Sequence, residues 1–302
     1  RTVTGVQTCA LRIWFMKDPD GSGVKDSPIA GALQEALGLL SISGLLGDSL
    51  GMQFSAPFSF IGVDTNGITL AANVSAVANS RPAGAPNFSA SLKVPEAFPS
   101  FSSLTPMGNL GYHMAISLGT SAFNQLLKAL VEGGLMNLEI SELGLSGADP
   151  VPITSDLLTA FIPEFGNLPP GTLLKIAVAP SVAPVLTGNV GPNPGEIAEL
   201  KISQLLVTIS AADGSEDYLQ VAADARTGLV LQYLQETNEI SFAIGSISGD
   251  DIHSIILQNN IDANEKALEG VIPVLVQQAL PLLSGGLGSI PLPSLLGLQP
   301  VG

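Results

Sequence analysis

The chain has 302 residues, of which 46% are apolar and 12% charged, and its net charge is −15. The apolar content excludes a disordered chain, and the acidic surface argues against nucleic acid and anionic membranes as partners. The most apolar stretch, from Val271 to Leu283, contains Pro273 and Pro281. It falls short of the ~18 apolar residues of a membrane-spanning helix. So many apolar residues beside so few charges indicate a protein that buries more hydrocarbon than its own core needs.

Cysteine and histidine are too scarce for the common metal centres. Cys9 is the only cysteine and the chain has 2 histidines, which excludes a multi-cysteine zinc site. The segment Asp18 to Asp26 resembles the opening of a calcium loop, because alternating carboxylates suit a hard cation. Ile29 stands where such a loop carries a bidentate Glu, so a solvated acidic turn is the favoured interpretation. The sequence therefore predicts neither a metal site nor a cofactor.

The N-terminal part of the chain divides into three segments. Residues 1–13 resemble translated sequencing-adapter read-through, so we interpret them as an artefact and the chain as a fragment of a longer protein. Ser27 and Pro28 are typical of a helix start, and apolar residues at helical spacing continue that helix to about Gly44. A Gly/Ser-rich stretch then extends to Pro57 and is the best candidate for a crossing between domains.

The middle of the chain combines strand-like segments, a proline-rich loop and one clear helix. Residues 58–77 are strand-like, whereas 81–106 lack periodicity and predict a long loop. Thr120 to Glu132 predicts an amphipathic helix that ends at Gly133 and Gly134. The apolar stripe of this helix contains Phe123, Leu126, Leu127 and Leu130.

The second half predicts an antiparallel meander followed by a long helix. A short helix is expected over 154–165, with a Thr or Ser cap, and the closing helix over 261–283, with a kink at Pro273. The expected strands are 173–178, 200–210, 218–225, 229–234 and 240–244. Apolar parity changes within the second strand, which predicts a β-bulge near Gln204. The fold class is therefore α+β, a highly curved, barrel-like antiparallel sheet wrapped on long amphipathic helices.

Several phrases, taken in order, resemble the sequences of one known family. Tyr112 to Asn124 resembles the family's strand and Ser-x-x-x-Phe-Asn helix, and Glu132 to Met136 resembles the end of that helix. Residues 154–164 and 82–95 are similar to its short helix and its proline-rich insertion. Ile290 to Pro293 resembles its Gly-Phe-Pro-Leu-Pro signature, with Ile where Phe is usual. The family is that of bactericidal/permeability-increasing protein, lipopolysaccharide-binding protein and cholesteryl ester transfer protein.

This resemblance implies a tubular lipid-binding fold. Residues 14–56 would form the end of a first barrel and the crossing, and 57–302 most of a second barrel, truncated at its C-terminus. The implied function is non-enzymatic: lipid binding or lipid transfer, secreted or periplasmic, with a phospholipid or another acyl-chain lipid in an apolar tube. The family's endotoxin-binding patch belongs to the first barrel, so endotoxin binding is not carried over. Pocket candidates are the stripes of the two helices, which can serve core packing as well, namely Phe123, Leu126, Leu127, Leu130, Leu268, Val271 and Leu275.

Two other functions stay open as alternatives. Gly47 to Gly51 satisfies Gly-x-Ser-x-Gly and resembles the Gly-Asp-Ser-Leu esterases, with Ser49 as nucleophile and Asp250 and His253 completing a triad. However, no Gly-x-Asn-Asp block supplies an oxyanion hole, and a meander is not the alternating fold of that class. A Gly/Ser-rich crossing is therefore the favoured interpretation of this motif. The remaining alternative is a structural surface domain without a ligand.

Overall fold

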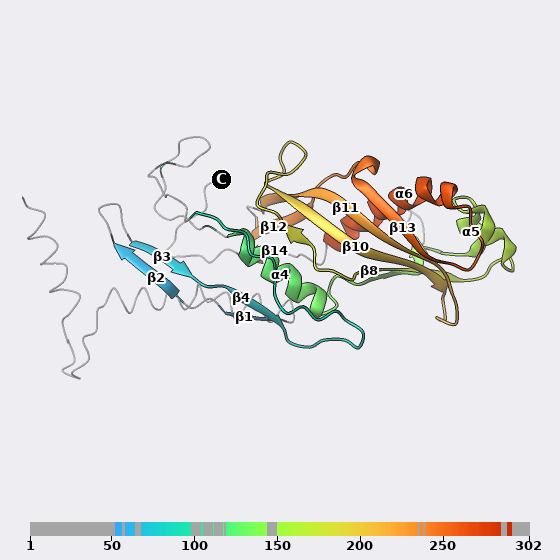
Figure 1. Cartoon of the computed structure of the whole chain (residues 1–302), viewed down its shortest axis with the longest axis horizontal. Coiled ribbons are helices and arrows are strands. Elements are labelled where there is room, and N and C mark those ends of the chain that lie inside the picture. The colour runs from blue at the N-terminus through green and yellow to red at the C-terminus, as the bar shows by residue number, and fades with distance from the viewer. Residues whose placement is uncertain are drawn as a thin grey trace, which may run out of the picture.

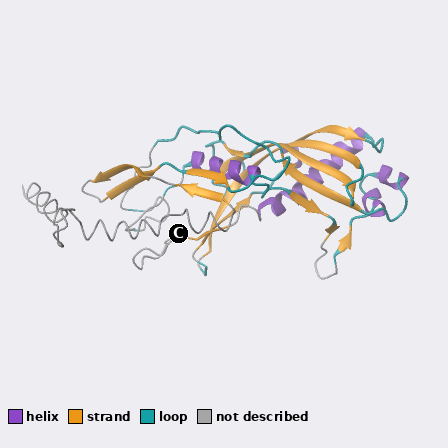
Figure 2. Cartoon of the chain, turned by 90° about the horizontal axis from the view of Figure 1, so that it is seen from below, coloured by secondary structure: helices purple, strands orange, loops and turns teal. Residues whose placement is uncertain are grey.

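The structure is a computed structural model and describes residues 52–55, 58–63, 68–97, 104, 111, 117, 119–143, 150–234, 236–237, 239–284 and 289–291. Its centre is an eight-stranded antiparallel sheet that curls strongly into a half-barrel (Figures 1 and 2). The strands of this sheet are β5 (Leu138–Ile140), β8 (Leu174–Pro180), β9 (Val185–Leu186), β10 (Ala198–Ala211), β11 (Asp217–Leu234), β12 (Glu239–Ile244), β13 (Ile252–Asn259) and β14 (Ser289–Pro291). Their order is β14-β12-β11-β10-β8-β5, with β13 beside β11 and β9 beside β10.

The bulge predicted in β10 is confirmed. β10 and β11 pair in register up to Ile202 and Ala225, and the register shifts before Leu205 and Ala223. Gln204 is one of the bulged residues of β10 and has a positive φ of 51°. Its N–H donates to Asp224 Oδ1 over 2.8 Å. Because a bulge bends its strand and increases the local twist, this site contributes to the curl of the sheet.

β11 is one strand, where the sequence predicted two separated at residues 226–228. Its first half pairs with β13 and its second half with β12, so the sheet branches along this strand. β13 was not predicted at all. Its outward residues Ile255 and Leu257 are apolar but 69% and 53% exposed, so its sequence lacks the apolar-in, polar-out alternation of a half-buried strand.

Two helices pack against the half-barrel. α4 (Thr120–Glu132) has the predicted bounds and lies beside β4 and β9. α6 (Glu265–Ser284) lies beside β12 and β13 and continues through Pro273 as one helix. It begins later than predicted because Asp262 has a positive φ of 54° and Glu164 Oε1 accepts the N–H of Asn264. The two helices have 13 and 20 residues, so they cover parts of the sheet only.

The other elements are short. The predicted helix over 154–165 is α5 (Ser155–Thr159), with Thr154 Oγ1 accepting the N–H of Leu157 over 3.3 Å, followed by the 3₁₀ helix η1 (Pro163–Asn167). A second 3₁₀ helix is η2 (Gly249–Asp251). Three two-stranded antiparallel pairs join β1 (Met52–Ser55) to β4 (Ser75–Ala78), β2 (Phe58–Val63) to β3 (Ile68–Ala72) and β6 (Glu142–Leu143) to β7 (Val151–Pro152).

The apolar core lies between the helices and the sheet. Leu130 of α4, Leu268 of α6 and Leu205 of β10 are all fully buried within one continuous cluster. None of the helices in the described part of the chain has both the length and the hydropathy that crossing a membrane requires. The division of the chain into domains stays a prediction, and residues 1–13 and nearly all of 14–56 lie outside the described residues.

Candidate functional site

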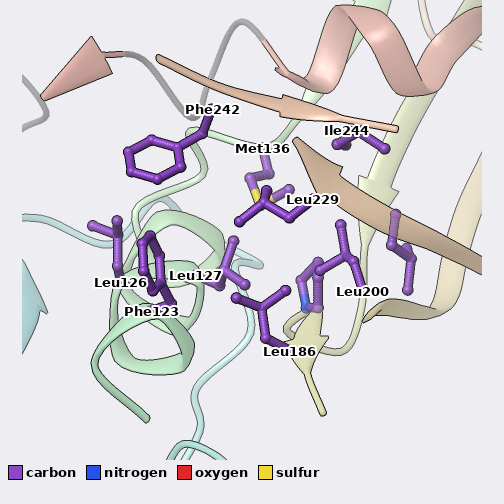
Figure 3. Close-up of a pocket in the computed structure, with 11 residues that line it drawn as sticks. Phe123, Leu126, Leu127, Met136, Leu186, Leu200, Leu229, Phe242 and Ile244 are labelled. Carbon is purple, nitrogen blue, oxygen red and sulfur yellow. The ribbon is translucent and has the colours of Figure 1, made fainter. Parts of the chain in front are cut away.

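An apolar pocket lies between α4 and the sheet. The cavity that it encloses is small, with a volume of about 20 Å³. Figure 3 shows that the labelled side chains of the helix and of the strands point into the space between them. The pocket is lined by Phe123, Leu126, Leu127, Met136, Pro184, Leu186, Leu200, Ile202, Leu229, Phe242 and Ile244. Because this set holds no charged or hydrogen-bonding side chain, the pocket suits hydrocarbon and offers nothing to a polar group.

The helical side of the pocket follows from the spacing of α4. Residues three and four apart share one helix face, which brings Phe123, Leu126 and Leu127 to the pocket. Phe123 meets Phe242 of β12 in an edge-to-face contact, with ring centroids 5.1 Å apart and planes at 73°. Such a pair is favourable beyond the area that it buries, so it joins the helix to the sheet at the pocket.

The sheet side comes from strand alternation and register. Leu200 and Ile202 are two residues apart in β10 and therefore share a face. Leu200 stands opposite Leu186 of β9, and Leu229 of β11 stands opposite Ile244 of β12. The register thus gathers apolar side chains from four strands around the pocket beside α4.

The buried carboxylate of Glu199, next to the pocket residue Leu200 in β10, lies on the face of the sheet that is turned away from the pocket. Glu199 precedes Leu200, so its side chain leaves the other side of the strand. Its oxygens accept hydrogen bonds from Asn189 Nδ2 over 3.0 Å, Thr187 Oγ1 over 2.6 Å and Arg226 Nε over 2.6 Å. These bonds to the charged form lower the pKa of Glu199 to about 2.

A second buried carboxylate lies at the end of α4. Burial opposes the charge of Glu132, but hydrogen bonds from Lys128 Nζ over 2.8 Å and from the N–H of Phe88 over 2.9 Å outweigh it. The pKa of Glu132 is therefore lowered. Both carboxylates stay ionised and bonded at neutral pH, and neither lines the pocket.

The structure places the predicted pocket residues in two groups. Phe123, Leu126 and Leu127 line the pocket, whereas Leu130 is fully buried behind them. The α6 residues lie elsewhere: Leu268 is fully buried, and Val271 packs against the core from a partly buried position. Leu275 is also partly buried and away from the lining. The described pocket is therefore bounded by α4 and not by both helices.

Sequence reasoning missed the whole strand side of the pocket. Leu186, Leu200, Leu229 and Ile244 come from segments as far as 58 residues apart, and only the register brings them together. Alternation in 200–210 and 229–234 marks one face as apolar. It does not tell which face meets α4, so no signal in these strands identifies the pocket.

Two of the three residues of the esterase alternative lie in the described part of the chain. Asp250 lies in η2 and His253 in β13, both exposed, and His253 stands opposite Asp224 of β11. Ser49 and the acidic segment 18–26 lie outside the described residues. Among those that are described, no three His, Cys, Asp or Glu side chains gather as a metal site would require.

Comparisons with known proteins find a weak structural similarity. No family model matches the sequence, and no curated protein matches it either. Among solved structures, a crystal structure of lipopolysaccharide binding protein is similar, with a TM-score of 0.33 and 13% sequence identity. The match covers 52% of this chain and 34% of that one, so it spans about a third of the solved protein. A likeness at this level assigns no function to the chain.

Proposed function

We propose that the protein binds an acyl-chain lipid in the pocket between α4 and the sheet. The observation that carries this proposal is the lining, in which every side chain is apolar and none is charged. Burial of hydrocarbon contributes ~0.8 kcal/mol per CH₂ group, so an acyl chain gains affinity there without any polar contact. A charged or sugar-like ligand would lose its hydration in the same place and gain no partner.

The finer parts of the proposal are supported by the sequence phrases that resemble the lipid-transfer family. They favour a tubular lipid-binding fold, a phospholipid or similar lipid as cargo, transfer as the purpose of binding, and a secreted or periplasmic location. We also propose that the protein binds its ligand without catalysis. Hydrolysis of short acyl esters that is lost in both Ser49→Ala and His253→Ala would contradict this and favour the esterase.

Binding is tested with cis-parinaric acid, a fluorescent fatty acid, added to the purified full chain. We expect saturable binding in the parent and co-purified lipid in its native mass spectrum. Leu127→Asp places an unpaired carboxylate in the lining, and we expect the Kd to rise at least about tenfold. Leu127→Trp fills the pocket with apolar volume and should weaken binding while it keeps the lining uncharged.

The matched control is Val190→Asp, because Val190 is 77% exposed and does not line the pocket. It should bind as the parent does. Circular-dichroism melts establish that each variant is folded. The proposal fails if the folded parent does not bind the probe, or if Val190→Asp weakens binding as much as Leu127→Asp.

A further inference from the structure

α4 has a second face that is polar and carries a row of hydrogen-bonding side chains. This polar row consists of Ser121, Asn124, Lys128 and Glu132, spaced three or four residues apart. Residues 81–97, here named the strap, run beside this face after β4, as Figure 1 shows in teal. α4 therefore lies between the strap on its polar side and the pocket on its apolar side.

The strap is held by hydrogen bonds between its backbone and the side chains of α4. Ser121 Oγ accepts the N–H of Val94 over 2.9 Å and donates to the carbonyl of Val94 over 3.1 Å. Glu132 Oε1 accepts the N–H of Phe88, as described above. At the first turn of α4, Glu96 Oε2 accepts the N–H of Thr120 over 2.9 Å. The contacts extend over the whole length of the helix, so the strap and α4 form one unit.

Asn124 joins this unit to the pocket. It is 1% exposed, and its amide NH₂ donates to the carbonyls of Leu92 in the strap over 3.2 Å and of Leu186 in β9 over 2.9 Å. Its Oδ1 accepts the N–H of Leu186 over 2.7 Å. One buried amide thus satisfies both backbone groups of Leu186, as a neighbouring strand would.

The backbone of Leu186 lies between β10 and Asn124. On the β10 side, Leu186 stands opposite Leu200, and the next residue, Thr187, donates its N–H to the carbonyl of Glu199 over 3.1 Å. On the other side, both backbone groups of Leu186 bond to Asn124. The side chain of Leu186 lines the pocket opposite α4. The backbone position of Leu186 therefore sets the distance between this side of the pocket and the helix.

We propose that Asn124 is a positioning residue for ligand binding, which fixes Leu186 and thereby sets the width of the pocket. This inference rests on the proposed function. It makes Asn124 a determinant of the selectivity of the pocket for straight over branched acyl chains. With Leu186 held, the pocket is narrow and prefers a straight chain. Without the Asn124 amide, Leu186 moves outward, and the affinity for a methyl-branched chain rises relative to that for a straight chain.

The experiment compares cis-parinaric acid, a straight chain, with phytanic acid, a methyl-branched chain, by competition on the full chain. In Asn124→Ala we expect the preference for the straight chain to fall at least about threefold. The matched control, Ser121→Ala, loosens the strap at Val94 but leaves Leu186 alone, and it should keep the preference of the parent. Leu186→Ala should change the preference directly. Because both substitutions act through one residue, Asn124→Ala combined with Leu186→Ala should change it no further.

The losses of affinity for the two lipids distinguish a positioning role of Asn124 from a merely structural one. If Asn124→Ala weakens both lipids by the same factor, or if the double variant shows the sum of the two single effects, the inference is overturned. Amide hydrogen exchange at Leu186 gives a readout without lipid. We expect faster exchange in Asn124→Ala and the parent rate in Ser121→Ala. If the parent binds neither lipid, the proposed function fails, and an unchanged exchange rate in Asn124→Ala overturns the positioning role independently.

Discussion

Glu199 and Leu200 are neighbours in β10 whose side chains serve opposite faces of the sheet. Leu200 lines the pocket, while the carboxylate of Glu199 is bonded to Arg226 and to the residues that follow β9. The bonds therefore tie β9, β10 and β11 together behind the pocket. Part of the stability of the fold therefore depends on the negative charge of Glu199.

The lowered pKa of Glu199 predicts a loss of stability in acid. An unfolded Glu titrates at about 4.3, whereas the pKa of folded Glu199 is about 2. The stabilisation is therefore complete above pH ~5 and is lost as the pH falls toward 2. Glu199→Gln should remove about 1–2 kcal/mol of this pH-dependent part, allowing for screening at the exposed Arg226. Urea unfolding at neutral and acid pH measures the difference.

The control for this experiment is Glu139→Gln. Glu139 pairs with Lys175, and its side chain is 62% exposed, so an exposed ion pair of this kind contributes little. The pH dependence of this variant should follow the parent. A Glu199→Gln variant whose stability falls with acid as steeply as that of the parent would contradict the assignment.

At the scale of elements, three glycines from separate segments pack against one buried carboxylate. Glu196 is 6% exposed and accepts hydrogen bonds from the N–H and Nδ2 of Asn193 over 2.8 and 2.9 Å. Its side chain packs directly over Gly191, Gly228 and Gly245, where a Cβ atom would collide with it. Gly228 therefore lets β11 continue as one strand past Glu196.

Gly228→Ala should destabilise the protein by at least about 2 kcal/mol, since the added methyl overlaps the buried side chain of Glu196. The matched substitution is Gly270→Ala in α6, where a Cβ atom meets nothing within 4 Å. That variant should gain about 0.5–1 kcal/mol from helix propensity. Thermal and urea unfolding of the two variants measure both changes. Equal effects from the two substitutions would show that the space around Gly228 is not limiting.

The elements that sequence reasoning predicted well are those with local signals. α4 combines an apolar stripe with two glycines at its end, and the bulge at Gln204 shows as a change of parity within one strand. The break predicted between residues 225 and 229 was wrong, because β11 is continuous there. Gly228 packs against the distant Glu196, a contact that no local signal shows. The pocket could be predicted only on its helical side. Its strand side depends on register, which is a property of pairs of segments and not of any one segment.

At the scale of the whole molecule, the charged residues and the pocket lining are separated. The chain carries a net charge of −15, yet none of that charge lines the pocket. The affinity for a ligand without net charge should then come from burial, which salt does not screen. The net negative charge of the protein would repel an anionic ligand as it approaches.

The proposed function therefore predicts that salt affects the binding of two lipid classes differently. A fluorescent phosphatidylcholine, which is zwitterionic, should bind with a Kd that changes less than about twofold between low and high salt. The Kd of cis-parinaric acid should fall slightly as salt screens the repulsion between two anions. Fluorescence titrations across a salt series measure both. Steep weakening with salt for either lipid would show that a cationic contact holds the ligand, which contradicts the pocket as described.

The long hairpin of β10 and β11 has a consequence for the order of folding. Its two strands are joined by a tight turn at Asp213 and Gly214, so they can meet with little loss of chain entropy. The contact between Asn124 and Leu186, by contrast, closes a separation of 62 residues. We therefore expect the hairpin to form early and α4 to dock late, when the strands that it covers are already paired. A hydrocarbon chain that is present during this last step can be enclosed as the helix arrives, without ever passing through a finished opening.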